Sequence, residues 1–126
     1  MPEQSSPRGS CVLVVEDEPM LLLMTNDLVE DAGLHPLLAG NADEAIRILE
    51  ARQDVCVVFT DVRMPGSMDG VGLAEAVRER WPPIRLLIVS GHLVKGSELP
   101  DGARFFHKPY PSEAIISALR ELAARP

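Results

Sequence analysis

Side chains that could do chemistry follow four apolar runs of the sequence, each where the run ends. Glu16 and Asp17 come directly after "CVLVV", and Asp61 follows "VCVVFT". Ser90 ends the run "LLIVS", and Lys108 follows "ARFFH". Loops held by a rigid sheet carry much of a protein's function, so these positions favour chemistry over packing.

If these four ends converge, they bring three carboxylates and one ammonium into one pocket. Carboxylates a few ångströms apart raise one another's pKa values, and a hard divalent cation removes that conflict. Mg²⁺ takes one or two carboxylates and retains much of its hydration. The acids Glu16, Asp17 and Asp61 therefore predict a Mg²⁺ site.

A cation, a lysine and a hydroxyl around one carboxylate suit the transfer of a phosphoryl group to that carboxylate. The metal and Lys108 would neutralise the phosphoryl oxygens, and Ser90 would donate a hydrogen bond to one of them. Asp61 would be the nucleophile.

Strand-like and helix-like patterns alternate along the chain. The apolar runs predict strands, and helical spacing predicts helices that begin near residues 19, 42, 70 and 112. Leu21, Met24, Leu28 and Ala32 form one stripe of the first helix, which we expect to be its apolar face.

Strands that alternate with helices predict a parallel sheet with helices on both faces, because right-handed crossovers put them there. The runs are apolar throughout instead of alternating, as expected for strands buried on both faces. Ligands of such open sheets bind outside the carboxyl ends of the strands, near the point where strand order reverses.

The length of 126 residues predicts one domain, which we place at 10–126 after a flexible tail at 1–9. The net charge of −7 disfavours direct binding to nucleic acid. With no secretory or membrane-spanning segment, we expect a cytoplasmic protein with no membrane partner. Cys11 and Cys56 lie in apolar runs and are interpreted as reduced core thiols.

The order of "VVEDE", "TDVRMP", "MDG", "VSG" and "HKPY" resembles bacterial response-regulator receiver domains over residues 11 to 124. The resemblance implies the flavodoxin-like (βα)5 fold, a doubly wound parallel sheet of strand order 2-1-3-4-5. It also implies a role in a two-component phosphorelay, with a sensor histidine kinase or a histidine phosphotransfer protein as partner. Such a chain would be a phosphoacceptor and not an enzyme.

By this resemblance Asp61 is the phosphoacceptor, and Ser90 and Lys108 contact the phosphoryl group. The metal ligands are implied to be Asp17, Asp61 and the backbone carbonyl of Arg63, with Glu16 assisting through water.

Three further positions carry expectations from the same resemblance. A cis peptide bond is implied before Pro109, and Phe105 takes the place of an aromatic residue that moves in the switch. Arg63 and His92 flank the acceptor, where side chains influence attacking water, so we expect them to tune the lifetime of the acyl phosphate.

Two segments depart from the usual pattern of the family. The turn "MPGSMDG" is one residue longer than usual, as in receivers paired with HWE-type histidine kinases. Only 17 residues separate Ser90 from Lys108, fewer than usual, and they contain two glycines and a proline in "HLVKGSELPDG". The fourth helix should therefore be short, irregular or mobile.

Phosphorylation would draw Ser90 and the loop behind it inward, because an acyl phosphate adds charge and acceptor oxygens. The surface made by the shortened segment, the fifth strand and the last helix would then change shape for partner binding or onward phosphotransfer. The initiating Met favours a stand-alone receiver, as a monomer or weak dimer, over a piece of a longer regulator.

Other interpretations remain open for the site and for the chain. Glu16 and Asp17 could cap the first helix, Lys108 could be a surface lysine, and Ser90 and Phe105 could be structural. The chain could be a degenerate receiver that binds partners without phosphorylation. A phosphatase of the haloacid dehalogenase type would need a second acid two places after Asp61, where Arg63 lies.

Overall fold

The computed structural model describes residues 11–62, 69–91 and 102–124. Five strands and four helices are assigned in these ranges, and their order along the chain is β1 (Cys11–Val15), α1 (Pro19–Asp31), β2 (His35–Ala39), α2 (Ala42–Ala51), β3 (Val55–Asp61), α3 (Gly70–Arg80), β4 (Arg85–Ser90), β5 (Arg104–His107) and α4 (Ser112–Ala124).

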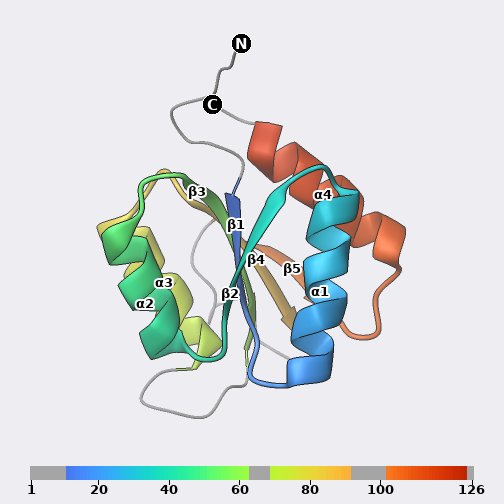
Figure 1. The fold of residues 1–126 in the computed structure, drawn as a ribbon, viewed down its shortest axis with the longest axis horizontal. Helices are drawn as coiled ribbons and strands as arrows, with labels where there is room; N and C mark the ends of the chain where they lie inside the picture. Colours follow the sequence, from blue (N-terminus) through green and yellow to red (C-terminus); the bar gives the residue numbers. More distant parts are fainter. Residues whose placement is uncertain (1–10, 63–68, 92–101, 125–126) are drawn as a thin grey trace.

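The strands form one parallel sheet in the order β2-β1-β3-β4-β5. Helices α1 and α4 cover one face, and α2 and α3 cover the other (Figure 1). The predicted fold class is thus confirmed. The predicted tail at 1–9 and most of the predicted short fourth helix lie outside the described residues.

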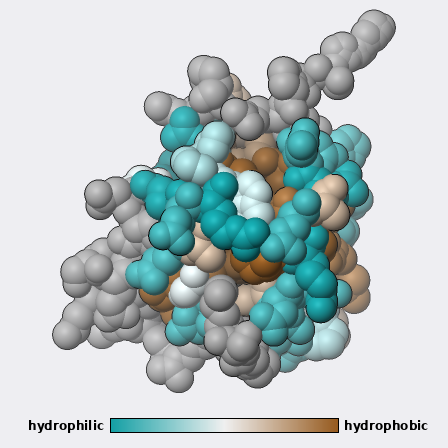
Figure 2. Space-filling model, turned by 90° about the vertical axis from the view of Figure 1, so that its left-hand side faces the viewer, coloured by the Kyte–Doolittle hydropathy of each residue, from teal (hydrophilic) through white to brown (hydrophobic). Residues whose placement is uncertain are grey.

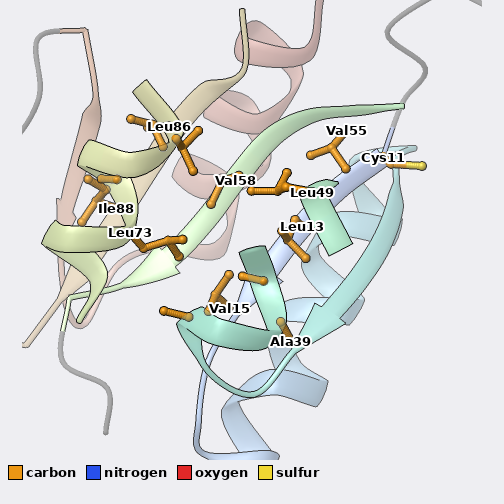
Figure 3. Packing of buried hydrophobic residues seen from close by; sticks show 14 residues of the cluster. Cys11, Leu13, Val15, Ala39, Leu49, Val55, Val58, Leu73, Leu86 and Ile88 are labelled. Atoms are coloured by element: carbon orange, nitrogen blue, oxygen red, sulfur yellow. The ribbon is translucent and has the colours of Figure 1, made fainter. Parts of the chain in front are cut away.

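Each face of the sheet has its own apolar core, which explains why the strands are apolar throughout. Leu13 and Val15 of β1 pack toward α2 and α3, while Val12 and Val14 pack toward α1 and α4. Figure 3 shows the first cluster, with Leu49 of α2 close to Val58 of β3. On the outer surface over α2 and α3, polar side chains prevail, with apolar residues between them (Figure 2).

Helices α2 and α3 begin at capping side chains. Asn41 Oδ1 accepts from the backbone N–H of Glu44 at 2.8 Å, and Asp69 Oδ1 accepts from Gly72 at 2.9 Å. These bonds satisfy amide groups that have no partner within the helix. Among the described residues, no helix is both long and apolar enough to cross a membrane.

The apolar stripe predicted for α1 is partly wrong. Thr25, Val29 and Ala32 are the buried residues, whereas Leu21 is 36% exposed and Met24 is 57% exposed. The segment before Thr25 is apolar on nearly every side, so sequence spacing could not tell which side faces the sheet. The turn of the helix places a threonine in the interior and leaves apolar side chains outside.

Both cysteines are free and buried, as predicted. Burial raises the pKa of the Cys56 thiol to about 11. The pKa of Cys11 is also raised, by burial and by Asp54, whose Oδ2 accepts from the Cys11 thiol at 3.3 Å. Both thiols are therefore protonated and unreactive at neutral pH.

Gly70 begins α3 directly against the end of β3. Its N–H donates to the carbonyl of Val62 at 2.7 Å, and a Cβ at this position would lie 2.0 Å from the backbone oxygen of Asp61. No side chain fits there without displacing the backbone beside Asp61.

We therefore expect Gly70→Ala to lower the free energy of unfolding by about 3 kcal/mol, since the clash is with backbone that cannot swing away. Urea unfolding followed by circular dichroism would measure the change. Gly91→Ala is the matched control, because a Cβ at Gly91 meets nothing within 4 Å. Equal stability of the two variants would contradict the close approach.

Candidate functional site

Glu16 and Asp61 lie side by side at the carboxyl edge of the sheet. Glu16 follows β1 and Asp61 ends β3, and these strands pair in parallel, with Val15 opposite Thr60. Neither side chain is in open solvent, since Glu16 is 8% exposed and Asp61 is 12% exposed. Two carboxylates are thus held together in a largely buried position.

Lys108, which follows the edge strand β5, lies close to both acids. Its Nζ lies 2.5 Å from Asp61 Oδ2 and 3.8 Å from Glu16 Oε1. The lysine follows β5, so residues from three strands meet at one point. Asp61 and Lys108, which the sequence placed at separate strand ends, form a direct ion pair.

Backbone hydrogen bonds continue past the ends of the strands and fix these residues. The N–H of Glu16 donates to Ala39 at 3.0 Å, and the N–H of Lys108 donates to the carbonyl of Ser90 at 2.8 Å. Ser90 itself is fully buried at the end of β4. The four predicted strand ends therefore lie along one edge, and Ser90 is held by the backbone that carries Lys108.

The first helix is capped by Glu18 and not by either predicted acid. The carboxylate of Glu18 accepts from the N–H of Met20 at 3.3 Å, and Pro19 takes the first helical position. Glu16 Oε2 accepts from the N–H of Glu18 at 3.1 Å. The interpretation of Glu16 and Asp17 as helix caps is therefore wrong, and Asp17 is exposed.

Burial raises the pKa of Glu16 to about 7, and the charges of Asp61 and Asp17 act in the same direction. The N–H of Glu18 and the ammonium of Lys108 oppose the shift. Burial also disfavours the charged form of Lys108, but its hydrogen bond to Asp61 and the charges of both acids raise the pKa of the lysine. The single positive charge of Lys108 thus does not balance the negative charges of the acids at the site.

The donor set fits a magnesium ion in part. Within the ranges that the structure describes, no group of three or more His, Cys, Asp or Glu side chains converges tightly enough to hold a metal. Mg²⁺ needs only one or two carboxylates and completes its shell with other oxygens. Glu16, Asp17 and Asp61 supply hard oxygen donors with excess negative charge, whereas the predicted carbonyl of Arg63 lies outside the described residues.

The remaining predicted residues have mixed outcomes. The peptide bond between Lys108 and Pro109 is cis, as the resemblance implied. Phe105 lies opposite Ile88 and packs against the core that faces α2 and α3, so its role in a switch stays a prediction. Arg63 and His92 lie outside the described residues, and their predicted effect on lifetime is untested.

Two residues of the site were not predicted. Thr25 of α1 and Tyr110, two places after Lys108, line a small cavity together with Glu16, Asp61 and Lys108. The signal in the sequence was a lone threonine within the apolar start of α1, and it pointed to no partner.

A family model for the response regulator receiver domain matches residues 12–120. This chain belongs to that family. Receiver domains accept phosphoryl groups from histidine kinases. The bacterial assignment and the phosphorelay class predicted from the sequence are confirmed.

Two curated relatives are similar to this receiver domain over most of its length. It is 37% identical over 114 residues to an NtrX-like response regulator of Rickettsia bellii, covering 86% of this chain and 24% of the relative. It is 33% identical over 124 residues to the hydrogenase transcriptional regulatory protein HoxA of Cupriavidus necator, covering 92% and 24%. The chain thus spans about a quarter of the length of these relatives.

Solved receiver structures have the same fold. A response regulator receiver protein from Sinorhizobium medicae is 28% identical with a TM-score of 0.84, covering 90% of this chain and 94% of that one. TrrA from Thermotoga maritima, solved in complex with Mg²⁺ and BeF, is 21% identical with a TM-score of 0.80, covering 90% and 98%.

The raised pKa of Glu16 predicts a pH-dependent cost to stability. The acid has a folded pKa of about 7, against 4.5 for an unperturbed glutamate, so its ionisation destabilises the fold as pH rises from 4.5 through 7. Glu16→Gln removes this cost and should therefore raise the free energy of unfolding. Without divalent cations, the gain at pH 8 should exceed the gain at pH 5 by about 2 kcal/mol.

Urea unfolding at both pH values, in the presence of a chelator, measures this difference. Glu75→Gln removes an exposed acid of α3 and should change stability equally at the two pH values. A gain for Glu16→Gln that does not depend on pH would show that the carboxylate is not the source of the cost.

Proposed function

We propose that this receiver domain accepts a phosphoryl group on Asp61 from a sensor histidine kinase or a histidine phosphotransfer protein in the cytoplasm. The observation that carries the proposal is the ion pair between Asp61 Oδ2 and Lys108 Nζ beside the Glu16 carboxylate. The Lys108 ammonium of this pair can shift from the Asp61 carboxylate to an oxygen of a phosphoryl group bound there.

In the transfer, a carboxylate oxygen of Asp61 attacks phosphorus while the bond from phosphorus to the donor's imidazole nitrogen breaks. The product is an acyl phosphate, and the departing imidazole takes a proton. During the transfer, negative charge moves from the carboxylate to the phosphoryl oxygens. The Lys108 ammonium neutralises the charge on those oxygens. The hydroxyl of Ser90, which is buried at the end of β4, would donate to one of those oxygens.

Mg²⁺ is the cofactor that this site would use, and when bound it neutralises the phosphoryl oxygens as a Lewis acid. Glu16, Asp17 and Asp61 would hold it, with the Arg63 carbonyl as the predicted fourth contributor. The excess of acid over base at the site, expressed in the raised pKa of Glu16, supports this. The complex of TrrA with Mg²⁺ and BeF shows such a group in a protein of the same fold.

The output of the reaction would be a change in the surface beside β5 and α4. Ser90 would move toward the phosphoryl group, and Phe105 would move when Ser90 engages it. The neighbouring surface would then bind a downstream protein. The segment between β4 and β5 that the sequence predicts to respond lies largely outside the described residues. An HWE-type kinase as donor and a monomeric or weakly dimeric state stay predictions.

Incubation with Mg²⁺ and phosphoramidate, followed by intact-mass measurement, tests the proposal. The wild-type chain should gain the mass of one phosphoryl group, and Asp61→Asn should gain none because an amide cannot form the acyl phosphate. Asp31→Asn, at the exposed far end of α1, is the matched control and should be modified like wild type.

Modification of Asp61→Asn, or none of the wild type, would contradict the proposal. The second outcome would favour the degenerate receiver, which binds its partner without phosphorylation.

The lifetime prediction for Arg63 and His92 can be tested on the same phosphorylated chain. Replacing both with alanine should change the hydrolysis rate of the acyl phosphate by several-fold, because these side chains would flank the path of attacking water. The decay of the modified mass after donor removal measures the rate. An unaltered half-life would rule the prediction out.

A further inference from the structure

Two hollows of the receiver domain share a wall at Lys108. An apolar groove of about 580 Å³ lies between α1 and the connection from β5 to α4. A second cavity, beside Asp61 and Glu16, has a volume of about 20 Å³. The side chains that line both are Leu21, Thr25, Lys108 and Tyr110. These residues therefore separate the groove from the acidic site.

The small cavity is an internal contact region and not a ligand site. A volume of about 20 Å³ for water centres admits about one water molecule. Its polar lining consists of Glu16, Asp61 and Lys108, which the proposed reaction uses, together with the hydroxyls of Thr25 and Tyr110. The two hydroxyls therefore share this cavity with the charged side chains of the site.

Both hydroxyls need polar partners, because Thr25 is buried and Tyr110 is half-buried. Thr25 is only 7% exposed, and its Oγ1 donates to the Leu21 carbonyl at 2.8 Å, so its lone pairs can accept from another group. Burial raises the pKa of Tyr110, and the phenol interacts with Thr25 and with the charge of Lys108. The hydrogen bond with Thr25 and the charge of Lys108 both oppose that rise.

Lys108 depends on such neighbours for its position. A lysine ends in a compact charge on a flexible four-carbon stem and has no rigid fork to fix it. Its side chain is 25% exposed, and it must remain on Asp61 while able to shift to a phosphoryl oxygen. Thr25 and Tyr110 line the same cavity as this side chain.

We propose that Thr25 and Tyr110 are positioning residues that hold Lys108 in reach of Asp61 during phosphoryl transfer. The inference rests on the proposed function of Asp61. The two hydroxyls form no bond to the phosphoryl group, and they act only by restricting Lys108.

The test uses variants that remove one hydroxyl and keep the shape of the side chain. Tyr110→Phe and Thr25→Val should each slow phosphorylation by phosphoramidate by about fivefold, the effect of losing one hydrogen bond of about 1 kcal/mol. This small donor needs no docked partner, so the groove plays no part in the measurement. Ser117→Ala removes an exposed hydroxyl of α4 and should leave the rate unchanged.

Repeating each substitution in a Lys108→Ala background separates positioning from a general structural effect. If the hydroxyls act through Lys108, neither loss should slow the reaction further once the lysine is gone. Equal slowing in both backgrounds would overturn the proposal, and so would unchanged rates in the wild-type background. Circular dichroism and thermal unfolding of every variant confirm that folded proteins are compared.

Tyr110 also provides a direct signal, because it is the only tyrosine of the sequence. Its ring proton resonances should shift when Mg²⁺ and beryllofluoride are added to the wild type, and should shift much less in Lys108→Ala. Equal shifts in the two proteins would contradict contact through the lysine. If the wild type gains no phosphoryl group, the proposed function itself fails. If the wild type is phosphorylated and Tyr110→Phe and Thr25→Val react at the same rate, this inference alone fails.

Discussion

The ion pair between Lys108 and Asp61, with Glu16 beside it, is the constraint around which this receiver domain is arranged. Taking charges out of water is costly, and a buried pair is weak support for a fold because its attraction repays that cost only in part. Here the balance is worse, because two largely buried acids share one ammonium. The raised pKa of Glu16 is the physical sign of that imbalance. Such an excess of acid fits the binding of a cation, as proposed above, better than it fits a role in stability.

The parallel sheet makes this costly cluster possible. Its strands all end at the same edge, and the order β2-β1-β3-β4-β5 places β1 and β3 side by side. Two apolar layers, one on each face, hold the strands so that the charged residues need not contribute to packing. Gly70 then lets α3 begin against the backbone of Asp61, so main-chain contacts fix the position of Asp61.

Much of this could be predicted from the sequence because strand ends are visible in it. Apolar runs followed by Asp61 or Lys108 predict residues at one edge, and the order of motifs gave the family and the strand order. The face of α1 could not be predicted, since its apolar residues outnumber the positions that the core can bury. The cap at Glu18 lies among three consecutive acids, and only geometry selects between them. Thr25 and Tyr110 meet across 85 positions of sequence, a proximity that no spacing encodes.

A crystal structure of the chain with Mg²⁺ and beryllofluoride tests the central claim most directly. The account predicts a beryllium fluoride group bonded to a carboxylate oxygen of Asp61, with Lys108 Nζ moved onto one of its fluorines and a cation among the acids. Asp61 left unmodified at saturating beryllofluoride, with Lys108 still paired to its carboxylate, would contradict it.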